Sequence, residues 1–307
     1  MGRINSKNIF LTGGLGFIGK NFQEYFSEKY CIFSPSHKEL DLLDEKAVFE
    51  FVKNNKIDII VHCANVGGGR DSLDETDVVE KNLRMFFNIA KCSDLVEKII
   101  HFGSGAEYDK SKPIIDVRED DTKIIIPKDD YGFYKYICSN FVNNSNNIIN
   151  LRLFGVYGKY ENYLFKFISN TIVKNILHLP IVIKQNVFFD YLYIDDLLKI
   201  VDHFIENDAK MKVLNATRGD KIDLKSLAEI VNEVSDYKSE ITIASPGMNN
   251  EYSSNNERLK KEIPGLKFTS HTQAIKILYS WYKNNMAMID KKRILNDPYI
   301  NNIIVNS

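Results

Sequence analysis

Cysteine is scarce in this chain of 307 residues and shows no pairing pattern. Its four cysteines (Cys31, Cys63, Cys92 and Cys138) are widely spaced, with no Cys-x-x-Cys pair. This spacing argues against a zinc site and against a disulfide framework, and it is typical of proteins in a reducing compartment. The six histidines show no metal-ligand spacing either, so we expect no metal site.

The chain also lacks an excess of charge and a long apolar run. Its formal net charge is −1 and no long basic block occurs, so neither nucleic acid nor an anionic membrane is an expected partner. No segment approaches the roughly 18 apolar residues of a membrane span, and the N-terminus lacks the apolar stretch of a signal peptide. These absences predict a cytoplasmic protein with no membrane association.

Short apolar runs alternate with helical patterns in the first half, which predicts a parallel sheet with crossover helices. Beyond residue 158 the alternation weakens, and the tail at 290–307 is either a docking segment or a frayed end. The expected strands are 8–12, 30–33, 57–63, 98–102 and 148–154, and the expected helices are 18–29, 47–54, 74–93, 131–142, 164–175, 224–234 and 270–285.

A glycine-rich turn follows the first predicted strand directly. Gly13, Gly16 and Gly19 form Gly-x-x-Gly-x-x-Gly, with Phe17 and Ile18 opening the next helix. Glycines at these positions allow a tight turn, the approach of backbone amides to a pyrophosphate, and close packing of helix on sheet. The turn therefore predicts a dinucleotide site.

The end of the second predicted strand bears on the choice of dinucleotide. NAD sites place an acidic residue there for the ribose hydroxyls, whereas this chain has Ser36, His37 and Lys38, with the first acid at Glu39. A cationic, hydroxyl-bearing cluster suits a 2′-phosphate, so NADP(H) is favoured and NAD(H) remains possible. The alternative is that His37 and Lys38 belong to a solvated turn.

Tyr131 and Lys135 lie four residues apart in a predicted helix and therefore share one face. An ammonium group beside a phenol favours the phenolate, so we expect Lys135 to lower the pKa of Tyr131 from about 10. Such a tyrosine can exchange a proton with a sugar oxygen while a nicotinamide carries a hydride. The alternative is a surface helix with an incidental aromatic residue and cation.

Further short motifs occur in one order along residues 8–285. They are Asp41-Leu42-Leu43-Asp44, Val61-His62-Cys63-Ala64, Asn82, Ser104, the run 151–158 and Tyr193-Ile194-Asp195-Asp196. Together with the glycine turn and the Tyr131/Lys135 pair, this set resembles the extended short-chain dehydrogenase/reductase family of nucleotide-sugar epimerases, dehydratases and reductases. Val66-Gly67-Gly68 looks most like the GDP-fucose synthase branch and its 4-keto reductases.

The resemblance implies an α/β fold. A Rossmann doubly wound parallel sheet is expected in residues 1–158, and a smaller C-terminal α/β substrate lobe in 159–307. Segments near 187–202 are expected to return to the Rossmann lobe. Relatives commonly dimerise through the helix around 77–92 and the helix that starts at Tyr131, so a homodimer is expected.

The resemblance also implies roles for individual residues. Tyr131 matches the catalytic acid/base, Lys135 the lysine that tunes it and holds the nicotinamide ribose, and Ser104 the hydroxyl that binds the reacting sugar oxygen. The other expected cofactor residues are Asp41, Leu42 and Ala64 besides the glycine turn and Ser36 to Lys38, and the other expected substrate residues are Val66, Gly67, Gly68 and Arg218.

Departures from the family pattern narrow the chemistry. Ala106 stands where GDP-fucose synthases carry a catalytic cysteine, and no histidine precedes His178 in the following loop, so C3/C5 epimerisation is disfavoured. Gly105 and Ala106 replace the Asp-Glu pair of dehydratases, and Glu107 is one residue late and should point to the opposite side. Gly155 replaces a usual asparagine, which puts substrate contacts in doubt.

The Ser-Tyr-Lys set that remains suffices for hydride transfer at one carbonyl. We therefore predict NADPH-dependent reduction of a 4-keto nucleotide-diphosphate sugar, with GDP favoured and dTDP and CDP open. The product would be a deoxysugar or modified-heptose donor for surface glycans. One alternative is an NAD-dependent C4 epimerase, and a second is a non-catalytic dinucleotide-binding protein.

Overall fold

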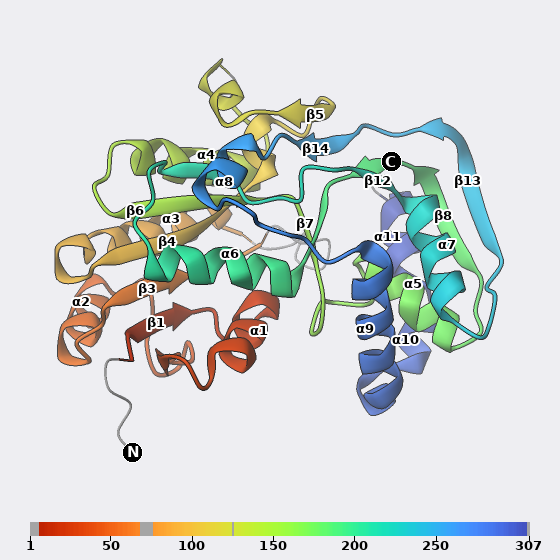
Figure 1. Ribbon diagram of the computed structural model, residues 1–307, viewed down its shortest axis with the longest axis horizontal. Helices are drawn as coiled ribbons and strands as arrows, with labels where there is room; N and C mark the ends of the chain where they lie inside the picture. The colour runs from red at the N-terminus through yellow and green to blue at the C-terminus, as the bar shows by residue number, and fades with distance from the viewer. Residues whose placement is uncertain (1–5, 68–75, 125, 306–307) are drawn as a thin grey trace.

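The buried apolar runs of the first half form a parallel sheet of six strands in the order β11-β6-β4-β3-β1-β2. The computed structural model describes residues 6–67, 76–124 and 126–305 (Figure 1). β1 lies between β2 and β3, so the chain progresses in opposite directions on either side of it, which confirms the doubly wound prediction. The strands are β1 (Asn8–Thr12), β2 (Cys31–Phe33), β3 (Ile59–His62), β4 (Lys98–Ser104), β6 (Ile148–Leu153) and β11 (Val213–Asn215).

Helices cover both faces of this sheet because successive strand side chains point to opposite faces. Ile9 and Ile59 pack in a core with α1 and α6, whereas Phe10 and Ile60 pack in a second core with α2, α3 and α4. The helices are α1 (Phe17–Phe26), α2 (Glu45–Asn54), α3 (Val78–Ala90), α4 (Asp130–Asn143) and α6 (Ile194–Glu206). The sheet is therefore buried on both faces, as its nearly continuous apolar strands require.

Most of the second half lies beside the large sheet, on the right of Figure 1, and we call this part the second lobe. The sheets outside the large one are short: β7 pairs with β10, β8 pairs with β13, and a four-stranded sheet that includes β5 from the first half has the order β12-β9-β14-β5. The strands are β5 (Ile114–Val117), β7 (Gly155–Tyr157), β8 (Ile181–Asn186), β9 (Phe188–Phe189), β10 (Tyr191–Tyr193), β12 (Ile222–Asp223), β13 (Ile241–Met248) and β14 (Tyr252–Ser254). The helices are α5 (Phe167–Ile176), α7 (Leu224–Val234), α8 (Glu257–Glu262), α9 (His271–Asn284), α10 (Lys291–Leu295) and α11 (Pro298–Val305), and the 3₁₀ helices of the chain are η1 (Ser93–Leu95), η2 (Gly105–Tyr108), η3 (Glu119–Ile124) and η4 (Met286–Met288).

One segment of the second half returns to the large sheet. α6 packs against α1, and β11 adds the outermost strand beside β6. The buried carboxylate of Asp196 in α6 accepts hydrogen bonds from the backbone N–H and the hydroxyl of Thr269, at 2.7 and 2.9 Å. Asp196 therefore connects α6 to the segment that precedes α9.

The C-terminal tail docks on the second lobe. The ring of Tyr299 in α11 packs against Phe167 of α5, with 6.1 Å between the ring centroids, and is 6 % exposed. Asp297 accepts a 2.6 Å hydrogen bond from the buried ammonium of Lys174. The described residues of the tail therefore form a docking segment and not a frayed end. No helix in the described ranges combines the length and the apolar character needed to cross a membrane.

Candidate functional site

The glycine turn between β1 and α1 brings two backbone segments into contact. Gly13 has φ +68°, and a Cβ on it would lie 2.8 Å from the backbone nitrogen of Ala64. A Cβ on Gly19 would lie 2.4 Å from the carbonyl oxygen of Gly13. Only glycine fits at either place. The turn therefore leaves the first amides of α1 facing outward, where an anion can bind.

A cavity of about 1030 Å³ opens at the carboxyl ends of β1 and β3. The predicted residues that line it are Gly13, Gly16, Phe17, Ile18, Gly19, Ser36, His37, Asp41, Leu42, Ala64, Val66, Gly67 and Tyr131. Lys38, Ser104, Lys135 and Arg218 are not among its lining residues, and Gly68 lies outside the described residues. The site thus lies at the point where the strand order reverses, as expected for an open α/β sheet.

Glu39, the first acidic residue after β2, does not line the cavity. One of its carboxylate oxygens accepts a 2.7 Å hydrogen bond from the backbone N–H of Ser36. Asp41 lines the cavity, and one of its oxygens accepts the backbone N–H of Leu43 at 3.0 Å. His37 lines the cavity as well, whereas Lys38 does not.

The structure brings Ser104 and Tyr131 into contact at the edge of the cavity. Tyr131 lies in the first turn of α4, and Ser104 is the last residue of β4. A Cβ on Gly132 would lie 2.6 Å from the carbonyl oxygen of Ala106, so the glycine allows α4 to pack closely on η2. The hydroxyl of Tyr131 lies close to that of Ser104 in this arrangement.

The expectation that Lys135 lowers the pKa of Tyr131 is wrong for this structure. Burial raises the pKa of Tyr131 above its usual value, and the nearby Ser104 hydroxyl opposes that rise without reversing it. The Lys135 ammonium donates instead to the carbonyl oxygen of Phe102 at 2.5 Å, and it lies 5.9 Å from the centre of the Tyr131 ring. Burial also lowers the pKa of Lys135. Tyr131 therefore keeps its proton.

Glu107 points away from the cavity, as expected, but for a different reason. It lies in the 3₁₀ helix η2, where strand alternation does not apply, and it is fully buried. One oxygen accepts the backbone N–H of Ser104 at 3.0 Å and the other accepts Nε of Arg152 at 2.6 Å. Arg152 donates further to the hydroxyls of Tyr108 and Ser139, each at 2.9 Å. Glu107 therefore supports the backbone of Ser104 from behind.

Arg218 lies outside the cavity lining and is already engaged. Its Nη1 donates to the carbonyl oxygen of Thr269 at 2.5 Å, and its Nε lies 2.5 Å from a carboxylate oxygen of Asp220. The side chain is 18 % exposed and lies against Phe268. Contact between Arg218 and a diphosphate would require it to leave these partners.

Tyr160, Glu161 and Asn162 follow Tyr157-Gly158 and line the cavity, which the sequence did not predict. Lys166 lines the cavity as well. A possible signal was a polar run directly after an apolar strand, at the carboxyl edge of the sheet where ligands bind.

Glu161 gives a testable pH dependence. Burial raises the pKa of its carboxyl from 4.5 to about 7, although the Ser169 hydroxyl donates to it at 2.6 Å. The folded protein holds this proton more tightly than the unfolded chain, so the stabilising contribution is complete below about pH 4.5 and is lost as pH rises through about 7. Glu161→Gln should remove this loss. The variant should exceed the wild type by up to about 3 kcal/mol in free energy of unfolding at about pH 8, and by much less at about pH 5.

Urea unfolding of both proteins without cofactor at the two pH values measures this difference. Equal differences between variant and wild type at both pH values would show that Glu161 is not protonated in the folded state.

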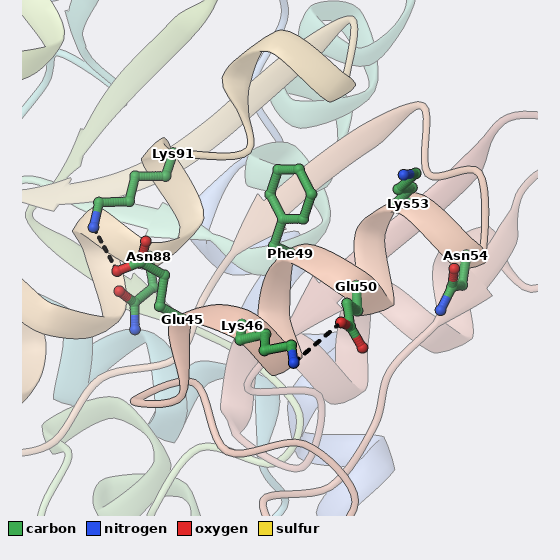
Figure 2. Close-up of a pocket in the computed structure, with 8 residues that line it drawn as sticks. All are labelled: Glu45, Lys46, Phe49, Glu50, Lys53, Asn54, Asn88 and Lys91. Carbon is green, nitrogen blue, oxygen red and sulfur yellow. Dashed lines mark hydrogen bonds and ion pairs between the residues drawn. The ribbon is translucent and has the colours of Figure 1, made fainter.

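A second cavity lies on the outer surface of α2 and has a volume of about 600 Å³ (Figure 2). Its charged side chains pair with one another: Lys91 lies 2.5 Å from Glu45, and Lys46 lies 4.0 Å from Glu50. None of the predicted site residues lines it. We therefore assign no ligand to this surface.

Comparisons with known proteins agree with the fold. The sequence profile of the "NAD dependent epimerase/dehydratase family" matches residues 9–216. The ADP-L-glycero-D-manno-heptose-6-epimerase of Brachyspira hyodysenteriae is 26% identical over 273 residues, which is 75% of this chain and 81% of that protein. The GDP-L-fucose synthase of Dictyostelium discoideum is 22% identical, with 92% of this chain and 97% of that protein covered.

Among solved structures, the chain is similar to the GDP-mannoheptose C4 reductase from Campylobacter jejuni with NADP bound. The TM-score is 0.79 at 20% sequence identity, with 92% of this chain and 100% of that chain covered. At this level of identity the likeness concerns the fold.

Proposed function

The chain belongs to the NAD dependent epimerase/dehydratase family, and from that premise we propose that it is an enzyme that modifies nucleotide sugars. The reaction we propose is NADPH-dependent reduction of a 4-keto nucleotide-diphosphate sugar. The observation that carries this proposal is the position of Tyr131, which lines the glycine-turn cavity with its hydroxyl close to that of Ser104. A reductase needs a proton donor at this place, whereas oxidation of an alcohol needs a base.

The residues present fit a dinucleotide. Gly13 and Gly19 leave no room for a Cβ, and the outward-facing amides of α1 suit a pyrophosphate. Gly16, Phe17 and Ile18 would hold the phosphates, Ser36, His37 and Asp41 the adenosine end, and Ala64 the region near β3. When bound, NADPH supplies the hydride.

The side chains of this protein supply the proton and stabilise the developing charge. Tyr131 donates its phenolic proton to the ketone oxygen, and Ser104 donates a hydrogen bond to the same oxygen as negative charge develops there. The Lys135 ammonium, held by the carbonyl of Phe102, lies 5.9 Å from the centre of the Tyr131 ring. Gly105 and Ala106 carry no ionisable group beside Ser104, so neither can deprotonate a neighbouring carbon.

We favour a GDP-linked substrate. Val66 and Gly67, which belong to the motif that resembles GDP-fucose synthases, line the cavity. The similar structure from Campylobacter is a GDP-mannoheptose C4 reductase. Such a product would serve deoxysugar or modified-heptose synthesis for surface glycans. The described part of residues 159–307, apart from α6 and β11, would form most of the substrate lobe.

We propose NADPH over NADH as the coenzyme, because His37 lines the cavity and the carboxylate of Glu39 is occupied by Ser36. The His37→Asp substitution should lower the ratio of kcat/KM with NADPH to kcat/KM with NADH by at least about tenfold. A carboxylate there repels the 2′-phosphate and can accept the ribose hydroxyls.

Lys38→Asp is the control, because Lys38 does not line the cavity and its charge change is larger. An equal or greater effect of Lys38→Asp would show that the selectivity is not local to His37.

We also propose a cytoplasmic homodimer that pairs α3 and α4. The ring of Phe141 on α4 is 42% exposed and contacts Phe87 of α3, with 5.2 Å between ring centroids. An apolar surface on these two helices suits a symmetric contact between copies.

A C4 epimerase is the second candidate, because it would use the same Ser104, Tyr131 and Lys135 without net consumption of cofactor. One similar protein, from Brachyspira, is an epimerase acting on a different nucleotide sugar.

Incubation with NADPH or NADH and a panel of GDP-, dTDP- and CDP-linked 4-keto sugars tests the proposal. We expect oxidation of NADPH by a GDP-linked 4-keto sugar and formation of a single alcohol. Turnover of a nucleotide sugar with no net change in coenzyme would favour the epimerase.

A further inference from the structure

A second tyrosine reaches the hydroxyl of Ser104 from the other half of the molecule. Tyr252 lies on β14, which pairs with β5 (Figure 1) and also with β9. Its hydroxyl lies close to that of Ser104, as does that of Tyr131. Ser104 therefore has two tyrosine hydroxyls near its own.

The fold holds Tyr252 in this place. The backbone carbonyl of Tyr252 accepts the N–H of Asp190 at 3.0 Å, and the carbonyl of the preceding residue, Glu251, accepts the N–H of Ile114 at 2.9 Å. The Tyr252 ring packs on Phe154 and Phe189, with 4.7 and 5.7 Å between ring centroids. The backbone and the ring of Tyr252 are therefore both held in place, which fixes the position of its hydroxyl oxygen.

Gly105 supplies the space for this hydroxyl. A Cβ on Gly105 would lie 2.5 Å from Oη of Tyr252 and 2.8 Å from the ring of Phe154. Gly105 has no positive φ in this structure, so its small size matters here through packing. The Tyr252 hydroxyl therefore occupies the space that a side chain at position 105 would fill.

The number of hydrogen bonds that the Ser104 hydroxyl can form limits the possible role of Tyr252. A serine oxygen has two lone pairs and one proton. The backbone N–H of Ala106 occupies one lone pair at 3.1 Å. If Tyr252 donates to the other, the Ser104 proton is the one group left, and it can point only toward Tyr131 or toward a carbonyl oxygen bound beside Tyr131.

We propose that Tyr252 is a positioning residue whose hydroxyl donates to Oγ of Ser104 and so directs the Ser104 proton to the sugar carbonyl oxygen. The proposal rests on the proposed function, because it takes Ser104 as the group that binds the reacting oxygen. Burial raises the pKa of Tyr252, so its hydroxyl remains a donor over the working range of pH. Tyr252 acts through Ser104 and needs no contact with the sugar.

Tyr252→Phe removes the hydroxyl and keeps the ring that packs on Phe154 and Phe189. We expect kcat to fall about tenfold, with KM for NADPH and the melting temperature unchanged, because one orienting hydrogen bond is lost. Tyr237→Phe is the matched control. Its hydroxyl donates to the carbonyl of His178 in the second lobe at 3.3 Å, and its loss should leave kcat unchanged.

A double-mutant cycle with Ser104→Ala separates positioning from independent action. If Tyr252 acts through Ser104, adding Tyr252→Phe to Ser104→Ala should lower kcat no further. Multiplication of the two effects would overturn the proposal, and so would an unchanged kcat in Tyr252→Phe alone.

Gly105→Ala perturbs the contact between Tyr252 and Ser104 without changing either residue. It tests the proposal if Tyr252→Phe does not fold. The added methyl displaces the Tyr252 hydroxyl, so kcat should again fall about tenfold with KM for NADPH unchanged. A wild-type kcat in Gly105→Ala would contradict the proposed role.

The cycle is measured on the reaction that the wild-type enzyme carries out. If the wild type epimerises and consumes no NADPH, the proposed function fails, yet the cycle still reports on Tyr252, because Ser104 binds the same oxygen in both reactions. If the wild type reduces the ketone and the cycle is multiplicative, only the role of Tyr252 fails.

Discussion

Replacement of Tyr131 by phenylalanine is expected to lower kcat for ketone reduction by about 10³-fold, within the range typical of a general acid. The phenylalanine ring keeps the edge-to-face contact with Tyr134, whose ring centroid lies 5.4 Å away, so the fold should be unchanged. The hydroxyl that donates the proton and lies close to that of Ser104 is the one group lost. Steady-state rates at saturating NADPH measure the effect.

NADPH affinity is the control for Tyr131→Phe, because the glycine turn and the Ser36–His37 segment are untouched. A kcat within about tenfold of the wild type, with NADPH binding intact, would remove Tyr131 from catalysis. Full biological activity in this variant would favour the remaining alternative, a non-catalytic dinucleotide-binding protein.

The second large effect concerns stability. Glu107→Gln should lower the free energy of unfolding by about 3–5 kcal/mol, because it leaves the buried charge of Arg152 without its partner. The side chains of this pair are 0% and 2% exposed, and Nε and Oε2 lie 2.6 Å apart. Glutamine can still accept one hydrogen bond, so the loss comes mainly from the uncompensated charge. Equilibrium urea unfolding measures it.

Glu50→Gln is the matched control on the surface. Glu50 lies 4.0 Å from Lys46, with the two side chains 57% and 86% exposed, and its loss should cost less than about 1 kcal/mol. A Glu107→Gln variant with wild-type stability but a much lower kcat would contradict the structural role, and would make Glu107 a catalytic group.

The sheet and its helices were predictable because their signals are local. The Gly13–Gly19 spacing predicted the turn, and β1 has the predicted bounds. Helix α7 likewise begins and ends where its apolar period predicted, at Leu224 and Val234. Burial of both faces makes the inner strands continuously apolar, and such strands are easily found in a sequence.

The small sheet β12-β9-β14-β5 was missed for a physical reason. Its strands have two to four residues each, and one of its pairings joins strands more than a hundred positions apart, where Tyr252 pairs with Ile114. Strands this short carry no periodic pattern, and their stability comes from contacts that the sequence does not reveal. Tyr252 therefore had no signal by which it could be assigned to the site.

The predicted pKa shift and the predicted charged site residues agreed least with the structure. The spacing of Tyr131 and Lys135 predicted that both share one face of α4, yet it could not show how deeply each is buried. Lys135 is buried and Tyr131 is half-buried. Burial decides the direction of both pKa shifts, and the Lys135 ammonium donates to the Phe102 carbonyl. Lys38 was predicted from its charge at the end of the second strand and Arg218 from its charge, and neither lines the cavity.

The transfer of deuterium from NADPH labelled at nicotinamide C4 tests the central claim most directly. The proposed reductase should place one deuterium at the new carbinol carbon of the sugar and form one NADP⁺ for each product. An epimerised sugar that carries no deuterium, formed without net NADP⁺, would contradict the account.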